Sequence, residues 1–276
     1  MSNERTSRSG GRGATDLRPT AIDIDVSKFA EGSVLVATGD TRVLVTASIE
    51  NRVPGFLVGS GKGWLTAEYS MLPRATATRT QREVTQGRPS GRTAEIQRLI
   101  GRGLRAAVDL SRLGERTLTL DCDVLQADAG TRTAAVTGGW VAAVLALSKI
   151  YLAGDLAAWP VVSQVAAVSV GLVDGVALLD LDYPEDQAAE VDLNVVGSVD
   201  GRLIEVQGTG ERRSFARAEL DTLLDLALAG VARLGDAQRA AVAERLAAVE
   251  EVRAKGVRLP APPKSERGLW GPPKGR

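Results

Sequence analysis

The order in which strand-like and helix-like segments follow one another predicts an α+β fold, with mixed sheets packed against helices. Strand-like segments open the sequence, a helix, a strand and a second helix follow, and four strands and two helices close it. Elements of one kind that occur in runs, rather than in strict alternation, are typical of α+β proteins. The 276 residues contain no long Pro-, Gly- or Ser-rich linker, so one large domain is expected.

Two β-branched runs near the N-terminus predict a hairpin. Gly32–Thr38 and Thr41–Ile49 are separated by two residues, a loop length that joins antiparallel strands. A third strand is expected at Trp64–Leu72. From Thr93 onward, apolar residues recur every three or four positions, which predicts a helix with Thr93 as its N-cap. The apolar stripe of this helix consists of Ile96, Leu99, Ile100, Leu104, Ala107 and Val108.

In the second half of the sequence, one strand is expected at Thr117–Leu125 and a long helix at about Thr131–Leu152. The four strands that follow are expected at Val165–Val173, Val176–Tyr183, Glu190–Ser198 and Leu203–Gly208. Asp-Gly pairs at 174–175 and 200–201 separate two pairs of these strands and indicate tight hairpin turns. The closing helices are expected at about Arg217–Leu234 and Asp236–Lys255.

Both ends of the chain have the composition of flexible tails. Residues 1–17 are rich in Arg, Ser and Gly, and residues 257–276 are rich in Pro and Gly, which leaves 18–256 as the folded domain. The first residues contain no apolar stretch of the kind that directs secretion. The apolar segment Gly138–Gly154 is interrupted by a serine and a lysine and predicts a buried helix. We therefore expect a cytoplasmic protein with no membrane partner.

The composition excludes several kinds of chemistry. The chain has 34 basic and 34 acidic side chains, no histidine and a single cysteine, Cys122. A serine or cysteine hydrolase of the usual kind needs an imidazole base, and a zinc site is built mainly from His and Cys. One cysteine also excludes a disulfide within the chain. Acid–base or metal chemistry must therefore depend on Asp, Glu, Lys, Arg, Tyr and backbone groups.

One glycine-rich segment is similar to the end of a nucleotide-binding P-loop. In Gly59–Gly63, however, a glycine follows Lys62 where the P-loop needs Ser or Thr, and no glycine lies five positions before Gly61. The segment also lacks the glycine spacing of a dinucleotide-binding turn. We expect no nucleotide P-loop here.

A better anion site is expected at Ala129–Thr133, between a strand and the start of a helix. The free N–H groups and the dipole of a helix N-terminus favour a negative ligand. Arg132 adds a planar donor for two phosphate oxygens, and Thr131 and Thr133 add hydroxyl groups. The spacing alone also allows a plainer interpretation, in which Thr131 only caps the helix and Arg132 is solvated.

A basic stretch is hidden within the neutral total charge. Its arginines are Arg74, Arg79, Arg82, Arg88, Arg92, Arg98, Arg102 and Arg105, and they are opposed only by Glu83 and Glu95. The stretch contains no aromatic residue, so contact with the backbone of single-stranded nucleic acid is favoured over base stacking. The alternative is a charged helix face, and this is the better interpretation of Arg102 and Arg105.

Two aspartates, Asp186 and Asp192, are expected to flank a strand junction, with Asp186 in the loop and Asp192 on the next strand. Such a pair can hold a hard cation such as Mg²⁺ or share a proton in acid–base chemistry. A carboxylate among apolar strand residues is costly unless it is paired or metal-bound. On sequence pattern alone, an ordinary surface turn with acidic residues remains the more common explanation.

Five longer strings resemble the ribonuclease PH family of phosphate-dependent 3′-exoribonucleases. They are Glu31–Val36, Gly63–Arg74, Gly91–Ile100, Leu120–Thr133 and Ile204–Thr209. The resemblance extends from Arg18 to about Gly230 and leaves out both tails. It implies a fold like the second domain of ribosomal protein S5 and a homohexameric ring, a trimer of dimers.

The resemblance also implies roles for individual residues. The phosphate site of the family matches Gly130, Thr131 and Arg132, together with Arg92. The paired aspartates of the family match Asp186 and Asp192, which are implied to be catalytic and to bind a divalent cation, Mg²⁺ or Mn²⁺. The tRNA-contacting arginines of the family match Arg74, Arg79 and Arg82. Ala129 is a departure, because a glycine is expected at that position.

The implied reaction is phosphorolysis of RNA. Inorganic phosphate, as co-substrate, attacks the last phosphodiester of a tRNA precursor or another RNA 3′ end, including that of ribosomal RNA. The products are a nucleoside diphosphate and a shortened RNA, and the reverse reaction adds nucleotides. Two alternatives remain: an inactive ring subunit that only binds RNA, and a core fragment of polynucleotide phosphorylase, whose second catalytic-like repeat this sequence lacks.

Overall fold

The computed structural model describes residues 8–256, and the first half of this range forms a five-stranded sheet in the order β1-β2-β3-β5-β4. The strands are β1 (Thr20–Ile24), β2 (Gly32–Thr38), β3 (Thr41–Glu50), β4 (Trp64–Met71) and β5 (Thr117–Gln126). The predicted hairpin is confirmed, since β2 and β3 pair antiparallel with Thr38 opposite Thr41. β4 pairs with β5 in parallel, so this sheet is mixed.

The second sheet is antiparallel, with the strand order β7-β6-β8-β9. Its strands are β6 (Val165–Val173), β7 (Val176–Leu179), β8 (Val191–Ser198) and β9 (Leu203–Gly210). The strand expected to reach Tyr183 is shorter than predicted. It ends at Leu179 because the backbone turns at Asp180, where φ is +55°, and Asp182 then caps the short helix α4 (Tyr183–Ala188).

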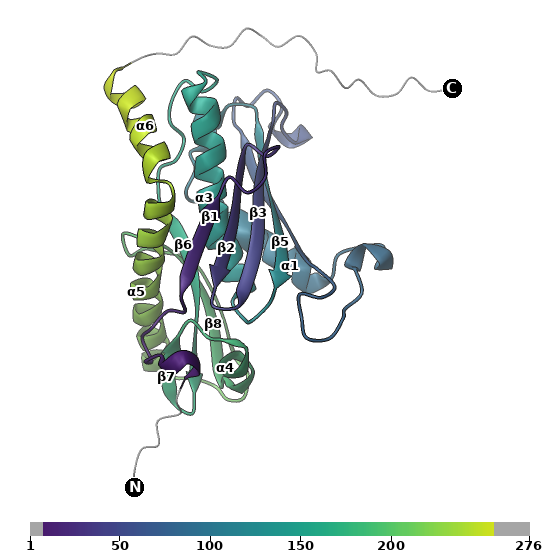
Figure 1. Cartoon of the computed structure of the whole chain (residues 1–276), viewed down its shortest axis with the longest axis vertical. Helices are drawn as coiled ribbons and strands as arrows, with labels where there is room; N and C mark the ends of the chain where they lie inside the picture. The colour runs from purple at the N-terminus through teal and green to yellow at the C-terminus, as the bar shows by residue number, and fades with distance from the viewer. Residues whose placement is uncertain (1–7, 257–276) are drawn as a thin grey trace.

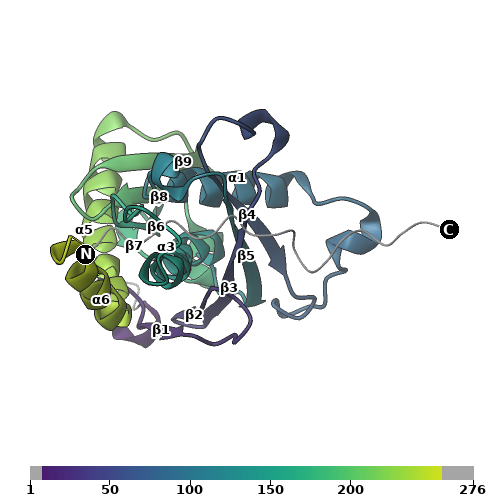
Figure 2. The ribbon, with the colours of Figure 1, turned by 90° about the horizontal axis from the view of Figure 1, so that it is seen from above.

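Helix α3 (Thr131–Leu152) lies between the two sheets and contacts β2 and β3 on one side and β6 on the other (Figures 1 and 2). Nearly all of its side chains from Thr133 to Ser148 are buried, as expected of a helix that is apolar on every side. Among the helices of residues 8–256, only α3 is long and apolar enough to cross a membrane. Most of that apolar stretch is buried inside the fold, as in a core helix.

The remaining helices cover the sheets from outside. They are α1 (Gly91–Arg105), α2 (Leu110–Leu113), α5 (Arg217–Ala241) and α6 (Ala243–Ala254), with short 3₁₀ turns at Ser9–Gly11 (η1), Gly55–Leu57 (η2) and Glu83–Gln86 (η3). α1 packs on β4 and α3, α5 covers β6 and β8, and α6 packs on α3 (Figure 1). The second sheet therefore lies between α5 and α3.

Three predicted helix boundaries were wrong. α1 begins at Gly91 rather than at Thr93, because the side chain of Ser90 accepts a hydrogen bond of 3.1 Å from the Thr93 amide and acts as the cap. α5 continues past Gly235 and ends at Ala241, so the last helix, α6, begins at Ala243 rather than at Asp236. Gly235 does not terminate the helix: a Cβ at this position would overlap the side chain of Val199, so the glycine permits close packing.

Arg8 is already part of the packed structure, ahead of the predicted domain start at Arg18. Arg8 is buried, and its side chain donates hydrogen bonds to the carbonyl groups of Leu179, at the end of β7, and of Asp180. Residues 8–17, assigned to a flexible tail on composition, are therefore held against the fold by buried arginine contacts. The first seven residues and the predicted tail 257–276 lie outside the described residues.

Replacing Gly32 with alanine is expected to destabilise the fold. A Cβ at Gly32, where β2 starts, would overlap the Ala142 carbonyl oxygen and lie 2.8 Å from the Ala146 amide nitrogen of α3. Because these are backbone atoms, α3 would have to move away from the sheet, at a cost of about 1–3 kcal/mol or more. Urea unfolding measures the effect, with Gly55→Ala as the control, since a Cβ at Gly55 meets nothing within 4 Å. Equal stability of the two variants would contradict this packing.

Candidate active site

Six of the predicted site residues line one cavity of about 540 Å³. They come from four separate places in the chain: the start of α1, the start of α3 with its N-cap residue, helix α4 and strand β8. These places meet because α3 packs against α1 as well as against the sheet that contains β8. The six residues are Arg92, Gly130, Thr131, Arg132, Asp186 and Asp192. The predicted phosphate site and the predicted carboxylate pair are therefore neighbours in space.

The N-terminus of α3 opens into this cavity through a loop of unusual backbone conformation. Ala129 and Gly130 have φ angles of +55° and +64°, both in the left-handed region. Thr41 holds the loop from both sides, because its hydroxyl donates to the Ala129 carbonyl (2.6 Å) and accepts from the Asp128 amide (3.0 Å). No side chain caps α3, so the first amides of the helix have no partner within it and are suited to an anion.

The side chains around this helix end are mostly positive or neutral donors. The Thr131 hydroxyl lies 2.7 Å from the hydroxyl of Tyr69, which is 4% exposed. Burial raises the pKa of the Tyr69 phenol, although the bond to Thr131 and the charges of Arg92 and Arg132 oppose it, so the phenol stays neutral. Arg132 donates to the side chain of Gln207 at 3.4 Å. This end of the cavity therefore offers amides, hydroxyls and two guanidinium groups.

The carboxylate pair lines the same cavity. Asp192 lies on β8, as predicted, whereas Asp186 lies on α4 rather than in an irregular loop. Burial raises the pKa of Asp192 to about 6, the charge of Asp186 adds to this increase, and Arg132 opposes it. Burial also raises the pKa of Asp186, against the charges of Arg92 and Arg132. Both acids are thus more easily protonated than an exposed aspartate.

The donor set fits Mg²⁺ or Mn²⁺ better than it fits zinc. Within residues 8–256 no group of three or more His, Cys, Asp or Glu side chains is arranged to hold a metal. Mg²⁺ keeps several waters and is commonly bound by one or two carboxylates together with substrate phosphates. Asn194 donates to Oδ2 of Asp192 at 3.4 Å, while the buried Oδ1 has no hydrogen-bond partner. A buried, unpartnered carboxylate oxygen is a suitable ligand for such a cation.

Sequence reasoning missed a buried ion pair next to Gly130, one of the residues that line the cavity. Arg18, which is 4% exposed, binds Asp180 at 2.7 Å and approaches Asp128 at 3.6 Å. The side chain of Asp128 also accepts from the amide of Tyr183 at 3.1 Å, which ties the loop before α3 to the start of α4. A Cβ at Gly130 would lie only 2.9 Å from the Arg18 guanidinium. Partners 110 to 162 positions apart leave no local pattern in the sequence.

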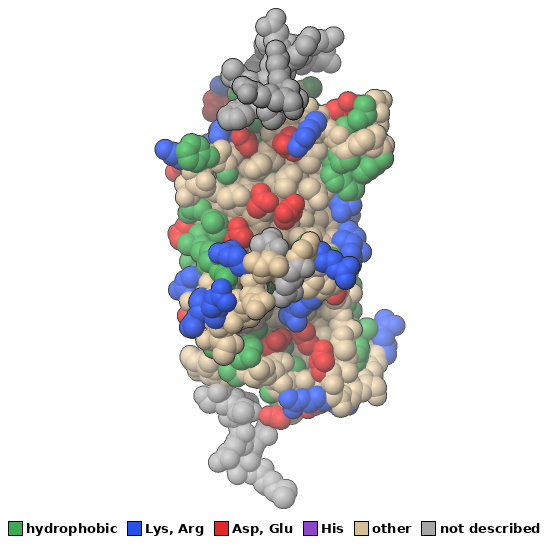
Figure 3. Space-filling view, turned by 90° about the vertical axis from the view of Figure 1, so that its right-hand side faces the viewer, with side chains coloured by type: hydrophobic (Ala, Val, Ile, Leu, Met, Phe, Trp, Pro, Cys, Tyr) green, Lys and Arg blue, Asp and Glu red, His purple; other side chains and the backbone are tan. Residues whose placement is uncertain are grey.

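Three predicted RNA-contacting residues, Arg74, Arg79 and Arg82, do not line the cavity. They are exposed in the segment between β4 and α1, which protrudes from the body of the molecule (Figures 1 and 2). Figure 3 views the face toward which this segment projects, and Lys and Arg side chains form a band across its middle. Arg92, at the start of α1, lies next to this arginine-rich segment and also lines the cavity.

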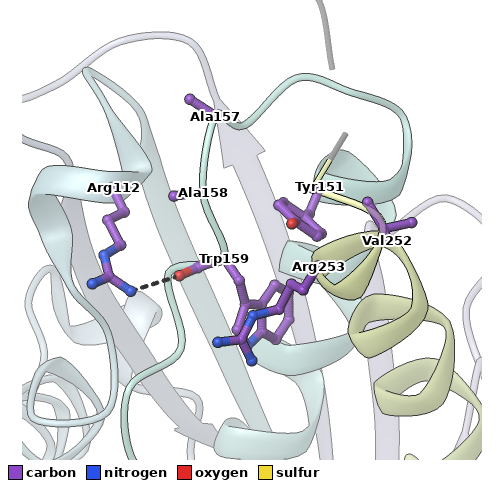
Figure 4. A pocket seen from close by; sticks show the side chains of 8 residues that line it. Arg112, Tyr151, Ala157, Ala158, Trp159, Val252 and Arg253 are labelled. Carbon is purple, nitrogen blue, oxygen red and sulfur yellow. Dashed lines mark hydrogen bonds between the residues drawn. The ribbon is translucent and has the colours of Figure 1, made fainter. Parts of the chain in front are cut away.

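A second hollow, of about 420 Å³, lies at the other end of α3, where α6 ends (Figure 4). It contains an edge-to-face pair of Tyr151 and Trp159, with ring centres 5.6 Å apart. Its two arginines, Arg112 and Arg253, are already paired with Asp109 and Glu250. It contains neither a carboxylate pair nor a helix N-terminus, so it does not match the predicted chemistry.

The fold and the first cavity together define an α+β protein that places an uncapped helix N-terminus beside paired carboxylates. Residues 16–150 match the model of the 3′ exoribonuclease family, domain 1, and residues 163–230 match the model of domain 2 of the same family. The two matches cover most of the chain between them. The chain therefore belongs to the 3′ exoribonuclease family, also called the RNase PH family.

Solved structures share this fold. The rice (Oryza sativa) Rrp46 crystal structure is 20% identical, with a TM-score of 0.68, and the match covers 84% of this chain and 98% of that one. A chain of the Archaeoglobus fulgidus exosome with RNA bound to the active site is 24% identical, with a TM-score of 0.71 and coverages of 84% and 92%. A chain of an archaeal exosome core is 23% identical, with a TM-score of 0.65 and coverages of 83% and 90%. These similarities confirm the predicted α+β fold.

Replacing Asp192 with asparagine is expected to stabilise the metal-free protein at neutral pH. The pKa of Asp192 is about 6 in the folded state, against 3.8 for an exposed aspartate. Between these values the folded state binds more protons than the unfolded state, so stability falls as the pH rises from about 4 to 6. Asp192→Asn removes this loss and should add roughly 1–3 kcal/mol at pH 7.

Urea unfolding in EDTA at pH 4, 5, 6 and 7 measures the effect, with Asp236→Asn as the control because that carboxylate is largely exposed. Added Mg²⁺ is expected to stabilise the wild type and leave Asp192→Asn unchanged. A wild-type stability that stays level or rises over this pH range, with no gain in Asp192→Asn, would contradict the buried, unpaired state of the carboxylate.

Proposed function

We propose that this protein is a phosphate-dependent 3′-to-5′ exoribonuclease that trims tRNA precursors and other RNA 3′ ends. The observation that carries the proposal is one cavity that contains both an uncapped helix N-terminus with two arginines and a half-buried aspartate pair. Membership of the 3′ exoribonuclease family supports RNA as the substrate class. A structural relative from Archaeoglobus fulgidus has RNA bound to its active site.

The arginine-lined end of the cavity holds inorganic phosphate. The first amides of α3 donate to its oxygens, the Thr131 hydroxyl adds a donor, and Arg92 and Arg132 supply two positive charges. Tyr69 fixes the Thr131 side chain and remains neutral, so it adds no charge that would repel the anion. The reaction brings two anions together, and fixed positive charge in a partly buried site is the main requirement for it.

Phosphorolysis makes one phosphorus–oxygen bond and breaks another. An oxygen of the bound phosphate bonds to the phosphorus of the terminal phosphodiester, and the bond from that phosphorus to the 3′-oxygen of the preceding nucleotide breaks. The electron pair stays on this 3′-oxygen, which takes a proton from the carboxyl group of Asp186 or Asp192. The products are a nucleoside diphosphate and an RNA with a new 3′-hydroxyl, and the reverse reaction extends RNA from diphosphates.

The aspartate pair also provides the site for a divalent cation. Asp186 and Asp192 would hold Mg²⁺ or Mn²⁺, and the cation would supply positive charge to the scissile phosphate and the departing 3′-oxygen. Asn194 fixes Oδ2 of Asp192, which leaves the unpartnered Oδ1 as the available ligand atom. No histidine is required at any step, in agreement with its absence from the sequence.

The protruding segment binds RNA away from the reacting end. Arg74, Arg79 and Arg82 are exposed on it and contact the phosphate backbone of the tRNA body. The protein acts in the cytoplasm as a homohexameric ring of three dimers, an assembly in keeping with its family. An inactive ring subunit is the alternative. The presence of the anion site and the carboxylate pair in a single cavity favours an active enzyme, because RNA binding alone needs neither.

Arg132→Ala is expected to abolish phosphate-dependent trimming and to leave RNA binding nearly unchanged. The variant removes one of two guanidinium groups at the helix end, and loss of such a group costs about 100-fold or more in turnover. The assay incubates a tRNA precursor with Mg²⁺ and phosphate and separates nucleoside diphosphates from monophosphates. Arg202→Ala is the control, since that arginine is exposed and pairs only with Asp200. Full turnover of Arg132→Ala, or digestion that is as fast without phosphate, would overturn the proposal.

Arg79→Ala and Arg82→Ala are each expected to weaken tRNA binding and its dependence on salt. Each variant removes about one phosphate contact, so the slope of log affinity against log salt should fall by about 0.7–1. Filter binding across 50 to 200 mM KCl is a suitable measurement. Arg217→Ala, on the outer helix α5, is a matched loss of one exposed positive charge. A wild-type slope in Arg79→Ala and Arg82→Ala would exclude a role for the protruding segment.

A further inference from the structure

Helix α4 forms part of the cavity lining, although it is only six residues long. Tyr183, Asp186 and Gln187 of this helix line the cavity. An isolated helix of this length is unstable in water, so its position must be imposed by contacts with the rest of the protein. The hydrogen bonds of the helix start identify these contacts.

The first turn of α4 is closed by a reciprocal capping box. The Asp182 carboxylate accepts from the Glu185 amide (3.1 Å), and the Glu185 carboxylate accepts from the Asp182 amide (3.0 Å). The amide of Asp186 donates to the Asp182 carbonyl group at 2.8 Å. The backbone position of Asp186 is therefore set directly by the residue that caps the helix.

Two arginines of the N-terminal segment, Arg8 and Arg12, bind the carboxylates of this capping box. Arg8 binds both oxygens of Glu185, at 2.7 and 2.9 Å, and also donates to the carbonyl groups of Leu179 and Asp180 at 2.8 and 3.1 Å. Arg12 binds Asp182 at 3.1 Å and Glu185 at 3.3 Å. The side chains of these two arginines are only 5% and 9% exposed.

These arginine contacts keep both capping carboxylates ionised. Burial alone would raise the pKa of Glu185, but the hydrogen bonds from Arg8 and from the Asp182 amide outweigh burial, and the pKa is lowered. The Asp182 pKa is lowered in the same way, against burial, by Ser9, the Glu185 amide and Arg12. A bidentate arginine bond to a buried carboxylate is among the strongest and most directional polar contacts in proteins. Loss of one partner would leave a buried charge unpaired.

We propose that residues 8–12 form a clasp on α4, in which Arg8 and Arg12 are positioning residues for Asp186. The clasp connects the N-terminal segment to the end of β7 and to the cap of α4, so the helix cannot rotate or unwind without breaking these bonds. The catalytic consequence rests on the proposed role of Asp186 in phosphorolysis. The structural consequence is that α4 is ordered only when the clasp is closed. This consequence does not depend on the proposed role of Asp186.

The test compares Arg8→Gln and Arg12→Gln with the wild type in the full-length protein. Hydrogen exchange should show loss of protection at the amides of Glu185 and Asp186, with α3 and α5 unaffected. The kcat for phosphorolysis should fall about 10- to 100-fold, the cost of a displaced catalytic group, while the KM for phosphate stays within about twofold. Arg8→Lys should recover part of the kcat, because it restores the charge but not the bidentate bond.

Arg233→Gln is the matched control. Arg233, on α5, donates to the Thr15 carbonyl at 2.7 Å and thus anchors the same N-terminal segment without touching α4. Wild-type protection of α4 in both clasp variants, or equal losses in Arg233→Gln, would overturn the proposal. If Arg8→Gln does not fold, Arg12→Gln decides the question by the same measurements. If the wild type releases no nucleoside diphosphates, the proposed function fails while the exchange data still decide the clasp.

Discussion

The burial of α3 between two sheets is the constraint on which the rest of the molecule depends. Because α3 is apolar and buried on every side, the packing of the core fixes the position of its N-terminus. This N-terminus opens into the cavity between α1, α4 and β8. The uncapped amides of its first turn are suited to an anion without any dedicated side chain. Arg92 and Arg132 then add charge at a place that the packing of the core has already fixed.

The distribution of charge in the molecule follows from the same arrangement. The net charge is zero, but exposed arginines are concentrated on the segment before α1, and several acids are buried or half-buried around the start of α4. Asp180, Asp182 and Glu185 are each neutralised by Arg18, Arg12 or Arg8. Asp192 has no such partner, and its raised pKa is the result. An acid left unpaired among paired ones costs stability, and such sites are where ligands or protons bind.

Sequence reasoning found the elements whose signals are local. The bounds of α3, β2 and β6 were predicted correctly, because continuous apolar or β-branched runs with glycine nearby define them. All six predicted cavity residues meet in one place, since long family-like strings contain four of them. Sequence reasoning did not find the parallel pairing of β4 or the buried arginines, because these depend on partners more than 50 positions away. It also missed α4, although the capping box of Asp182 and Glu185 is a local signal. The functional roles of the six cavity residues are predictions, and the proposed experiments test them.

Ala129 illustrates how the scaffold preserves a site when the local sequence does not favour it. A left-handed backbone costs an alanine about 1–2 kcal/mol, and glycine would avoid that cost. The structure nevertheless holds φ at +55°, because Thr41 bonds the backbone on both sides and Gly130, next in line, must leave room for Arg18. The loop shape is thus imposed by partners on β3 and before β1, and not by the flexibility of the loop itself. Strain at this position is tolerated because the surrounding packing determines the geometry of the helix entrance.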